Sequence, residues 1–333
     1  GLALFVGRAQ QPAHLCVFAT QPLQFAPQQR RRPASLRTWA WRVAELATGS
    51  AATPLPGPVT DEVRRAAALA LRTDSLPPQA QALLVRASND VDDIVRYHAL
   101  LALHRNADPT TLRDVTVRCL ADADAGVNVV AAQIAAENGW DDMVGLMDSA
   151  FLRLSGPDQF QIAVALTELI EPERASQQLV DVLIRALKDE TTLAAACKSL
   201  ARLRAGRAAA PLRKVMTSFF AHPINRVEAA AALVALDDEE GAHYLEKMLD
   251  GRRRDTRGYA IETIARLGLE IYRPRIEAIA RSTEYHADTA VLALRNFGDS
   301  RAFELLRDIA RNHPDPEIRE LAAQTSAADG TLR

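Results

Sequence analysis

Residues 296–323 read NFGDSRAFELLRDIARNHPDPEIRELAA, and this stretch contains one complete copy of the motif that decides the fold. Its first half places Leu305, Leu306 and Ile309 at the spacing of one face of a helix. Its second half, which follows Asp315, is an Ala-rich segment with the same spacing. We therefore interpret the stretch as two consecutive helices joined by a turn.

This two-helix motif recurs along the chain from about residue 63 to the C-terminal end. The second helices are expected to begin near Val63, Val95, Val127, Phe160, Leu193, Val227, Arg257, Asp288 and Ile318. Successive starts are separated by 32, 32, 33, 33, 34, 30, 31 and 30 residues. A repeat of this length predicts stacked two-helix units rather than one closed core.

Small residues follow each predicted start at a fixed distance. Four residues after the starts stand Ala67, Ala99, Ala131, Val164, Cys197, Ala231, Ile261, Leu292 and Ala322. Five of these nine are alanines, which would allow neighbouring helices to approach closely. One pair of helices cannot bury both of its apolar faces alone, so the stack as a whole is expected to fold.

Proline and glycine punctuate the predicted helices. Prolines fall near most of the expected boundaries, where a missing N–H does least harm. Gly139, Gly206, Gly268 and Gly298 stand where helices should end, and we expect them to adopt the left-handed cap conformation. Strand signals are nearly absent after residue 60. The sequence therefore predicts an all-α solenoid of about nine helix pairs over residues 59–327, followed by a tail at 328–333.

The repeats resemble the HEAT-repeat family, and in particular the short HEAT-like repeats of the phycobilisome-lyase type. The resemblance rests on an Asp in the turn, a Val-Arg or Ile-Arg pair and then alanines at helical spacing, as in Asp92, Val95-Arg96 and Ala99. It implies that the turn Asp caps the second helix and that the Arg of one unit reaches a neighbour's Asp. Where the Arg is expected, the middle units carry Asn128, Ala194 and Glu228 instead, so this ladder should be interrupted there.

The first 58 residues differ in composition from the rest. No Asp or Glu occurs from Gly1 to Ala44, and Gln, Pro and Arg are frequent, including Arg30, Arg31 and Arg32. We interpret this segment as an irregular arm with a possible short hairpin. One short helix is expected from Ser35 to about Ala47, with Trp39 and Trp41, followed by a linker. Such an arm would be ordered by packing on a partner, on another copy of the chain in a homo-oligomer, or on the first repeats of its own solenoid.

Composition and charge narrow the class of function. The chain has 333 residues, of which 48% are hydrophobic and 25% charged. No run approaches the ~18 apolar residues of a membrane span. Three cysteines without CxxC spacing favour a reducing compartment, in the cytoplasm or inside an organelle, and the acid-poor start leaves organelle targeting open. Residues 45–333 carry 34 basic and 42 acidic residues, a net charge of −8, which argues against nucleic acid as the main ligand.

No catalytic constellation is recognised in the sequence. The seven histidines form no HxxxH, HExxH or His-Glu pattern, and no GxGxxG or P-loop motif is present. The HEAT-repeat enzyme deoxyhypusine hydroxylase holds iron through His-Glu dipeptides, so its activity is not implied here. We accordingly expect no catalytic residue, no metal and no cofactor.

The sequence therefore favours a non-enzymatic scaffold, or an accessory subunit of a larger assembly, that binds a protein partner. The expected binding residues lie on the second helices, in the arm and in one basic turn. They are Arg96, His98, Gln133, Glu168, Arg202, Glu228 and Glu262 on the helices, Arg30, Arg31, Arg32, Trp39 and Trp41 in the arm, and Arg253 in the turn. Two alternatives stay open: a chromophore (bilin) lyase-like subunit, and a nucleic-acid-binding HEAT-like solenoid.

Overall fold

The computed structural model describes residues 61–72, 78–249 and 254–327. Within these ranges the chain forms seventeen α-helices and four short 3₁₀ segments, and it forms no strand. We call the even-numbered helices the inner helices and the odd-numbered helices the outer helices. The inner helices are α2 (Asp61–Ala70), α4 (Asp93–Asn106), α6 (Ala125–Glu137), α8 (Gly156–Leu169), α10 (Glu190–Arg202), α12 (Pro223–Ala235), α14 (Arg254–Arg266), α16 (Ala287–Phe297) and α18 (Pro316–Ala327).

The outer helices alternate with the inner ones along the chain. They are α3 (Pro78–Ala87), α5 (Pro109–Cys119), α7 (Val144–Arg153), α9 (Gln177–Ala186), α11 (Ala209–Thr217), α13 (Glu239–Leu249), α15 (Arg273–Arg281) and α17 (Ser300–Asn312). Three of the 3₁₀ segments, η1 (Asp141–Met143), η3 (Gly206–Ala208) and η4 (Glu270–Tyr272), lead directly into outer helices, and η2 (Pro172–Arg174) precedes α9.

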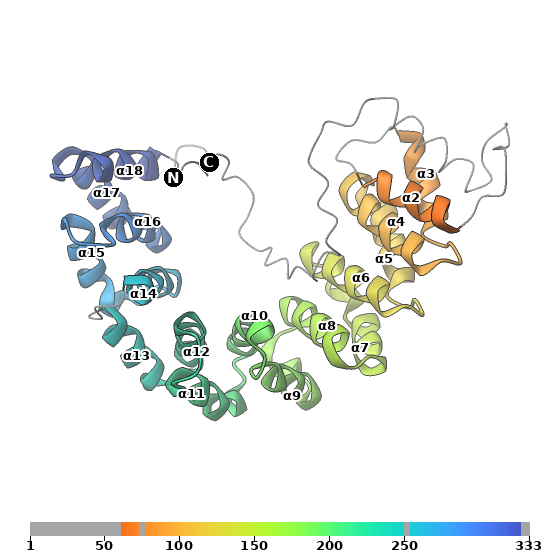
Figure 1. Cartoon of the computed structure of the whole chain (residues 1–333), viewed down its shortest axis with the longest axis horizontal. Coiled ribbons are helices and arrows are strands. Elements are labelled where there is room, and N and C mark those ends of the chain that lie inside the picture. Colours follow the sequence, from red (N-terminus) through yellow and green to blue (C-terminus); the bar gives the residue numbers. More distant parts are fainter. Residues whose placement is uncertain (1–60, 73–77, 250–253, 328–333) are drawn as a thin grey trace.

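The helices are stacked into an open arc, and the inner helices lie along its concave side (Figure 1). Each inner helix from α4 to α18 packs on the outer helix of its own unit, and all the inner helices pack on the inner helices of adjacent units. All nine predicted starts fall within the nine inner helices. The prediction of an all-α solenoid is therefore confirmed for the described part of the chain.

A quartet of buried positions explains how the inner helices pack. In α4, Ala99, Leu100, Ala102 and Leu103 are all 0% exposed. The equivalent buried quartets are Ala131, Ala132, Ile134 and Ala135 in α6; Ile162, Ala163, Ala165 and Leu166 in α8; Ala196, Cys197, Ser199 and Leu200 in α10; Ala229, Ala230, Ala232 and Leu233 in α12; Ala260, Ile261, Thr263 and Ile264 in α14; and Ala290, Val291, Ala293 and Leu294 in α16. Spacing of i, i+1, i+3 and i+4 gathers each set on one face of its helix, so small and large residues from adjacent units interlock there.

The structure corrects the expected small-residue positions in two units. Val164 is only partly buried and Leu292 is 53% exposed, and both stand in the middle of their quartets, whereas Ala163 and Ala290 are buried members of those quartets. In both helices the quartet begins two residues after the predicted start, Phe160 or Asp288, whereas it begins four residues after the start in α4 and α6. Counting four residues from the start therefore reaches the middle of the quartet in α8 and α16.

Most of the predicted turn chemistry is present. Asp92, Asp124 and Asp189 cap α4, α6 and α10, each accepting a hydrogen bond from a backbone N–H of the first turn. Gly139, Gly268 and Gly298 have positive φ as expected.

The expectation for Gly206 was wrong. Helix α10 already ends at Arg202, so the left-handed position after it falls on Arg204, with φ of 45°, and Gly206 opens η3.

Candidate functional site

On each inner helix from α4 to α18, one position faces directly away from the side that packs in the stack. Because a helix turns by about 100° per residue, the residue in the middle of the quartet points to the opposite side. We call these residues the groove column. It consists of Leu101, Gln133, Val164, Lys198, Ala231, Glu262, Leu292 and Gln324. Since the inner helices line the concave side of the arc, the column lies along the groove, and five of its members (Gln133, Lys198, Glu262, Leu292 and Gln324) are exposed.

Ion pairs between neighbouring inner helices lie beside the groove column. Glu168 of α8 lies 3.4 Å from Lys198 Nζ and 3.6 Å from Arg202 Nη1, both on α10. Arg202 also donates to the backbone carbonyl of Glu168 at 2.7 Å. The structure therefore brings together Glu168 and Arg202, two residues that the sequence singled out separately.

Glu228 takes part in a second contact between units. It accepts a hydrogen bond from Tyr259 Oη at 2.6 Å, and Arg266 Nη2 lies 3.6 Å from the same carboxylate oxygen. Burial, followed by the hydrogen bond to Glu228, raises the pKa of Tyr259 well above its usual range. This phenol therefore stays protonated and donates to Glu228 at all physiological pH values.

The two histidines of α4 differ in their surroundings. His104 Nε2 lies 2.9 Å from Glu137 of α6, which makes it another link between units. Burial lowers the pKa of His98, and the positive charge of Arg72 lowers it further. His98 is therefore predominantly neutral at pH 7.

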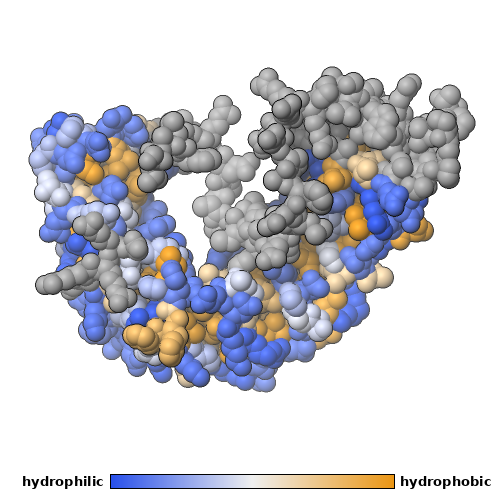
Figure 2. Space-filling model, in the orientation of Figure 1, coloured by the Kyte–Doolittle hydropathy of each residue, from blue (hydrophilic) through white to orange (hydrophobic). Residues whose placement is uncertain are grey.

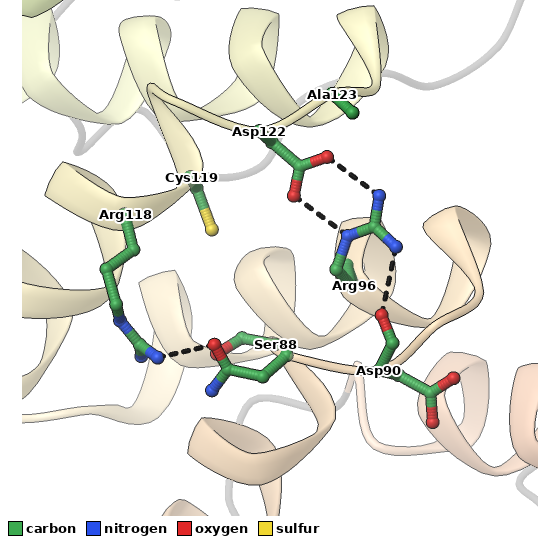
Figure 3. Close-up of a pocket in the computed structure, with 8 residues that line it drawn as sticks. Ser88, Asp90, Arg96, Arg118, Cys119, Asp122 and Ala123 are labelled. Atoms are coloured by element: carbon green, nitrogen blue, oxygen red, sulfur yellow. Dashed lines mark hydrogen bonds and ion pairs between the residues drawn. The ribbon is translucent and has the colours of Figure 1, made fainter.

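Arg96 holds the turns of its own and the next unit together (Figure 3). Its guanidinium pairs with Asp122 at 2.7 and 2.8 Å and donates to the carbonyls of Asp90 and Val91. Arg65 pairs with Asp92 in the same way at 2.6 Å. Contacts from an Arg to a neighbour's turn Asp, which the repeat resemblance implies, are thus present at this end of the arc.

In the middle units other polar side chains bind the end of the preceding outer helix. Asn128 donates to the carbonyl of Cys119, Gln159 to that of Phe151, Thr192 to that of Ala186, and Arg226 to that of Met216. The residues equivalent to Arg96 in α10 and α12 are therefore found near Thr192 and at Arg226, and the placement at Ala194 and Glu228 was wrong. The quartets of α10 and α12 begin three and two residues after the predicted starts, Leu193 and Val227, and not four residues after them, which causes this error.

Two of the pockets in the described chain lie outside the groove column. The first, of about 330 Å³, lies between the turns that precede α4 and α6 and is lined by Arg96, Arg118, Cys119 and Asp122 among others (Figure 3). Burial raises the pKa of Cys119 to about 11, so its thiol stays protonated. The second, of about 410 Å³, is lined by Met216, Glu239, Glu240, His243, Tyr244 and Lys247.

An exposed aromatic pair lies in the turn between α11 and α12. Phe219 and Phe220 are 89% and 92% exposed, with their ring centroids 5.8 Å apart. Hydrophobic side chains also gather on the surface over α11–α13 in Figure 2. The sequence analysis missed this pair. The sequence signal that could have identified the pair is the presence of two adjacent aromatic residues between the end of a helix and Pro223. A turn of that length cannot bury both rings.

The remaining predicted residues fall on the groove or outside the described ranges. Gln133 and Glu262 belong to the exposed groove column. Arg30, Arg31, Arg32, Trp39, Trp41 and Arg253 lie outside the described residues. In the described ranges, no cluster of three or more His, Cys, Asp or Glu side chains is placed to hold a metal, and no helix has the length and apolarity needed to cross a bilayer.

Comparisons with known proteins concern the fold. No family model and no curated protein sequence matches the chain. Among solved structures, the CpcE–CpcF complex of phycocyanin lyase from Nostoc sp. aligns over 83% of this chain and 99% of its own, with 16% identity and a TM-score of 0.46. Human deoxyhypusine hydroxylase, solved with glycerol, aligns over 87% of this chain and 96% of its own, with 16% identity and a TM-score of 0.29. An engineered protein aligns over 87% of this chain and 96% of its own, with 16% identity and a TM-score of 0.25. The stacked helix pairs define the fold of the described chain as an α-solenoid.

Proposed function

We propose that this protein is a non-enzymatic scaffold that holds a protein segment along its concave groove. The observation that carries the proposal is the groove column, in which successive inner helices present side chains to the same open side of the arc. A row of this kind suits an extended ligand, because each unit adds one more contact point along the same line.

The chemistry of the groove column favours a polypeptide as that ligand. It combines amides (Gln133 and Gln324), one cation (Lys198), one anion (Glu262) and an exposed apolar side chain (Leu292). A protein segment offers partners for all of these groups. A nucleic acid would require a continuous basic stripe, and the column has only a single cation.

The contacts between units support the same function by fixing the spacing of the groove. Glu168 and Glu228 are each bonded to the following inner helix. A surface held in place before binding loses less conformational entropy when a partner docks. These two carboxylates therefore act as positioning residues.

The test compares two matched double variants as bait in a native extract. The groove variant carries Gln133→Lys and Glu262→Lys, and the control carries Gln178→Lys and Glu304→Lys on the outer helices, where both residues are exposed. Mass spectrometry should identify a protein partner that wild type and control retain and that the groove variant loses by roughly tenfold or more. Equal recovery with both variants would reject the groove as the binding site.

The same capture separates the two alternative functions. A chromophore lyase-like subunit would bring down a coloured tetrapyrrole or a phycobiliprotein subunit. A nucleic-acid-binding solenoid would retain nucleic acid with a steep dependence on salt. Recovery of either one in place of a protein partner bound through the groove would overturn the scaffold proposal.

A further inference from the structure

The outer helices α11 and α13 carry a pocket with an exposed aromatic pair beside it. Phe219 and Phe220 stand in the turn that follows α11, where they are 89% and 92% exposed and their rings meet edge to face. Met216, three residues before Phe219, lines the second of the two pockets described above. Hydrophobic side chains gather on this part of the surface in Figure 2. An exposed apolar patch with polar residues around it marks a site of interaction with another molecule.

The pocket, which we call the α11–α13 pocket, has room for aromatic rings. Met216 is 3% exposed and Tyr244 is half-buried, so the deeper part of its lining is apolar. An apolar cavity of about 150 Å³ holds one benzene ring, and the α11–α13 pocket has about 410 Å³. The thioether of a methionine also attracts aromatic rings. Since Phe219 and Phe220 are exposed, they leave the pocket of their own chain open.

The exposed charges of α13 match a second copy of the same helix. Glu240 lies in its first turn and Lys247 in its last turn, and both side chains are exposed. Seven residues make almost two full turns of a helix, so both project from one face. Within its own chain Glu240 lies 3.6 Å from Arg213, and its side chain remains 63% exposed. Two antiparallel α13 helices, related by a two-fold axis between His243 and Tyr244, place Glu240 of each copy opposite Lys247 of the other.

We propose that this surface joins two copies of the chain through a two-fold axis. Each copy contributes the same patch to such an interface, so a protrusion and a pocket on one surface are both used twice. The aromatic pair of each copy enters the α11–α13 pocket of the other, and the two Glu240–Lys247 pairs fix the antiparallel alignment. The surface belongs to outer helices, and it is therefore separate from the groove column on the inner helices.

The size of the patch fits a dimer of moderate strength. An aromatic side chain buries about 150–250 Å², so the four phenylalanine rings of two copies bury roughly 600–1,000 Å². A specific interface needs about 1,000–1,200 Å² or more. The exposed face of α13 supplies the remainder, because it is covered by the same face of the second copy. An interface near the lower end of this range is expected to bind in the micromolar range.

Sedimentation of the full chain tests the role of the aromatic pair. The wild-type chain should be dimeric at about 100 µM and dissociate on dilution. Phe219→Ser combined with Phe220→Ser should raise the dimer dissociation constant by about tenfold or more. Ile271→Ser is the matched control, because it removes a 79% exposed apolar side chain from η4, and its effect should stay within about twofold. Circular dichroism should show the same helix content in all three proteins, because the replaced side chains are exposed.

A charge exchange between copies tests the second copy and the alignment together. Glu240→Lys and Lys247→Glu should each weaken self-association by about tenfold, because like charges then face one another. An equimolar mixture of these two variants should regain dimers of wild-type strength, since both facing pairs are again opposite in sign. Glu304→Lys, on the exposed side of α17, is the control for charge and should have no effect.

Three results would overturn the proposal. The first is a wild-type chain that stays monomeric at the concentration given above, even if its aromatic pair captured a different protein from an extract. The second is undiminished self-association of the phenylalanine variant. The third is a mixture of the two charge variants that associates no more strongly than either variant alone.

Discussion

Replacing Ala131 with Asp is expected to lower the free energy of unfolding by about 3–5 kcal/mol, because a carboxylate would be forced between close-packed helices without a partner. Ala131 is 0% exposed and belongs to the buried quartet of α6. This helix packs on both α4 and α8, so the space for a larger side chain is limited on two sides. Urea unfolding followed by circular dichroism at pH 7 measures the loss.

Gln133→Asp is the matched control for this substitution. Gln133 lies two residues further along the same helix, but it belongs to the groove column and is exposed. The same introduced carboxylate should cost no more than about 0.5 kcal/mol there. If the two variants lost equal stability, the assignment of buried and groove faces on the inner helices would be incorrect.

Arg273→Ala is expected to cost about 3–5 kcal/mol, because it leaves a buried carboxylate without its main partner. The Arg273 side chain is 3% exposed and lies 3.0 Å from Glu277, whose side chain is 9% exposed. It also pairs with Asp299 at the start of α17 and stacks on the ring of Phe297 at 4.9 Å. The guanidinium holds the pKa of Asp299 well below its usual range.

Two further variants distinguish a buried charge from a simple loss of contacts. Arg301→Ala removes the other cation near Glu277, but the Arg301 side chain is 62% exposed, so the cost should stay below about 1 kcal/mol. Arg273→Met combined with Glu277→Leu removes both buried charges and should recover most of the lost stability. A double variant as unstable as Arg273→Ala would mean that packing, and not the unpaired carboxylate, causes the loss.

The architecture could be predicted because the apolar pattern repeats in every unit. A two-helix unit with a capping Asp and an Ala-rich second helix allows few other arrangements, and all nine inner helices lie where the period places them. The register within a helix was less predictable. The buried quartet begins two to four residues after the predicted start, and each residue of this offset turns the face by about 100°, which is why Leu292 was assigned to the core although it faces the groove.

The candidate site could be predicted only in part for the same reason. Gln133 and Glu262, which the sequence singled out, are exposed members of the groove column, but Lys198 and Leu292 of the same column were not singled out. Arg96 was selected because it is charged and lies on an inner helix, yet its partners are turn groups of its own unit and Asp122 of the next unit. A single sequence does not show which charged side chains bind within the protein and which face a partner.

Removal of α17 and α18, by deleting residues 299–333, tests most directly whether each helix pair is covered only by its neighbours. Hydrogen exchange should accelerate by about tenfold or more in α15 and α16, which lose their contacts with the deleted helices. Exchange in α4 to α10 should stay within about twofold of the full chain, because in the described structure these helices pack only on nearby units. Loss of protection throughout α4 to α10 would contradict the account, since it would show one cooperative core in place of a row of stacked units.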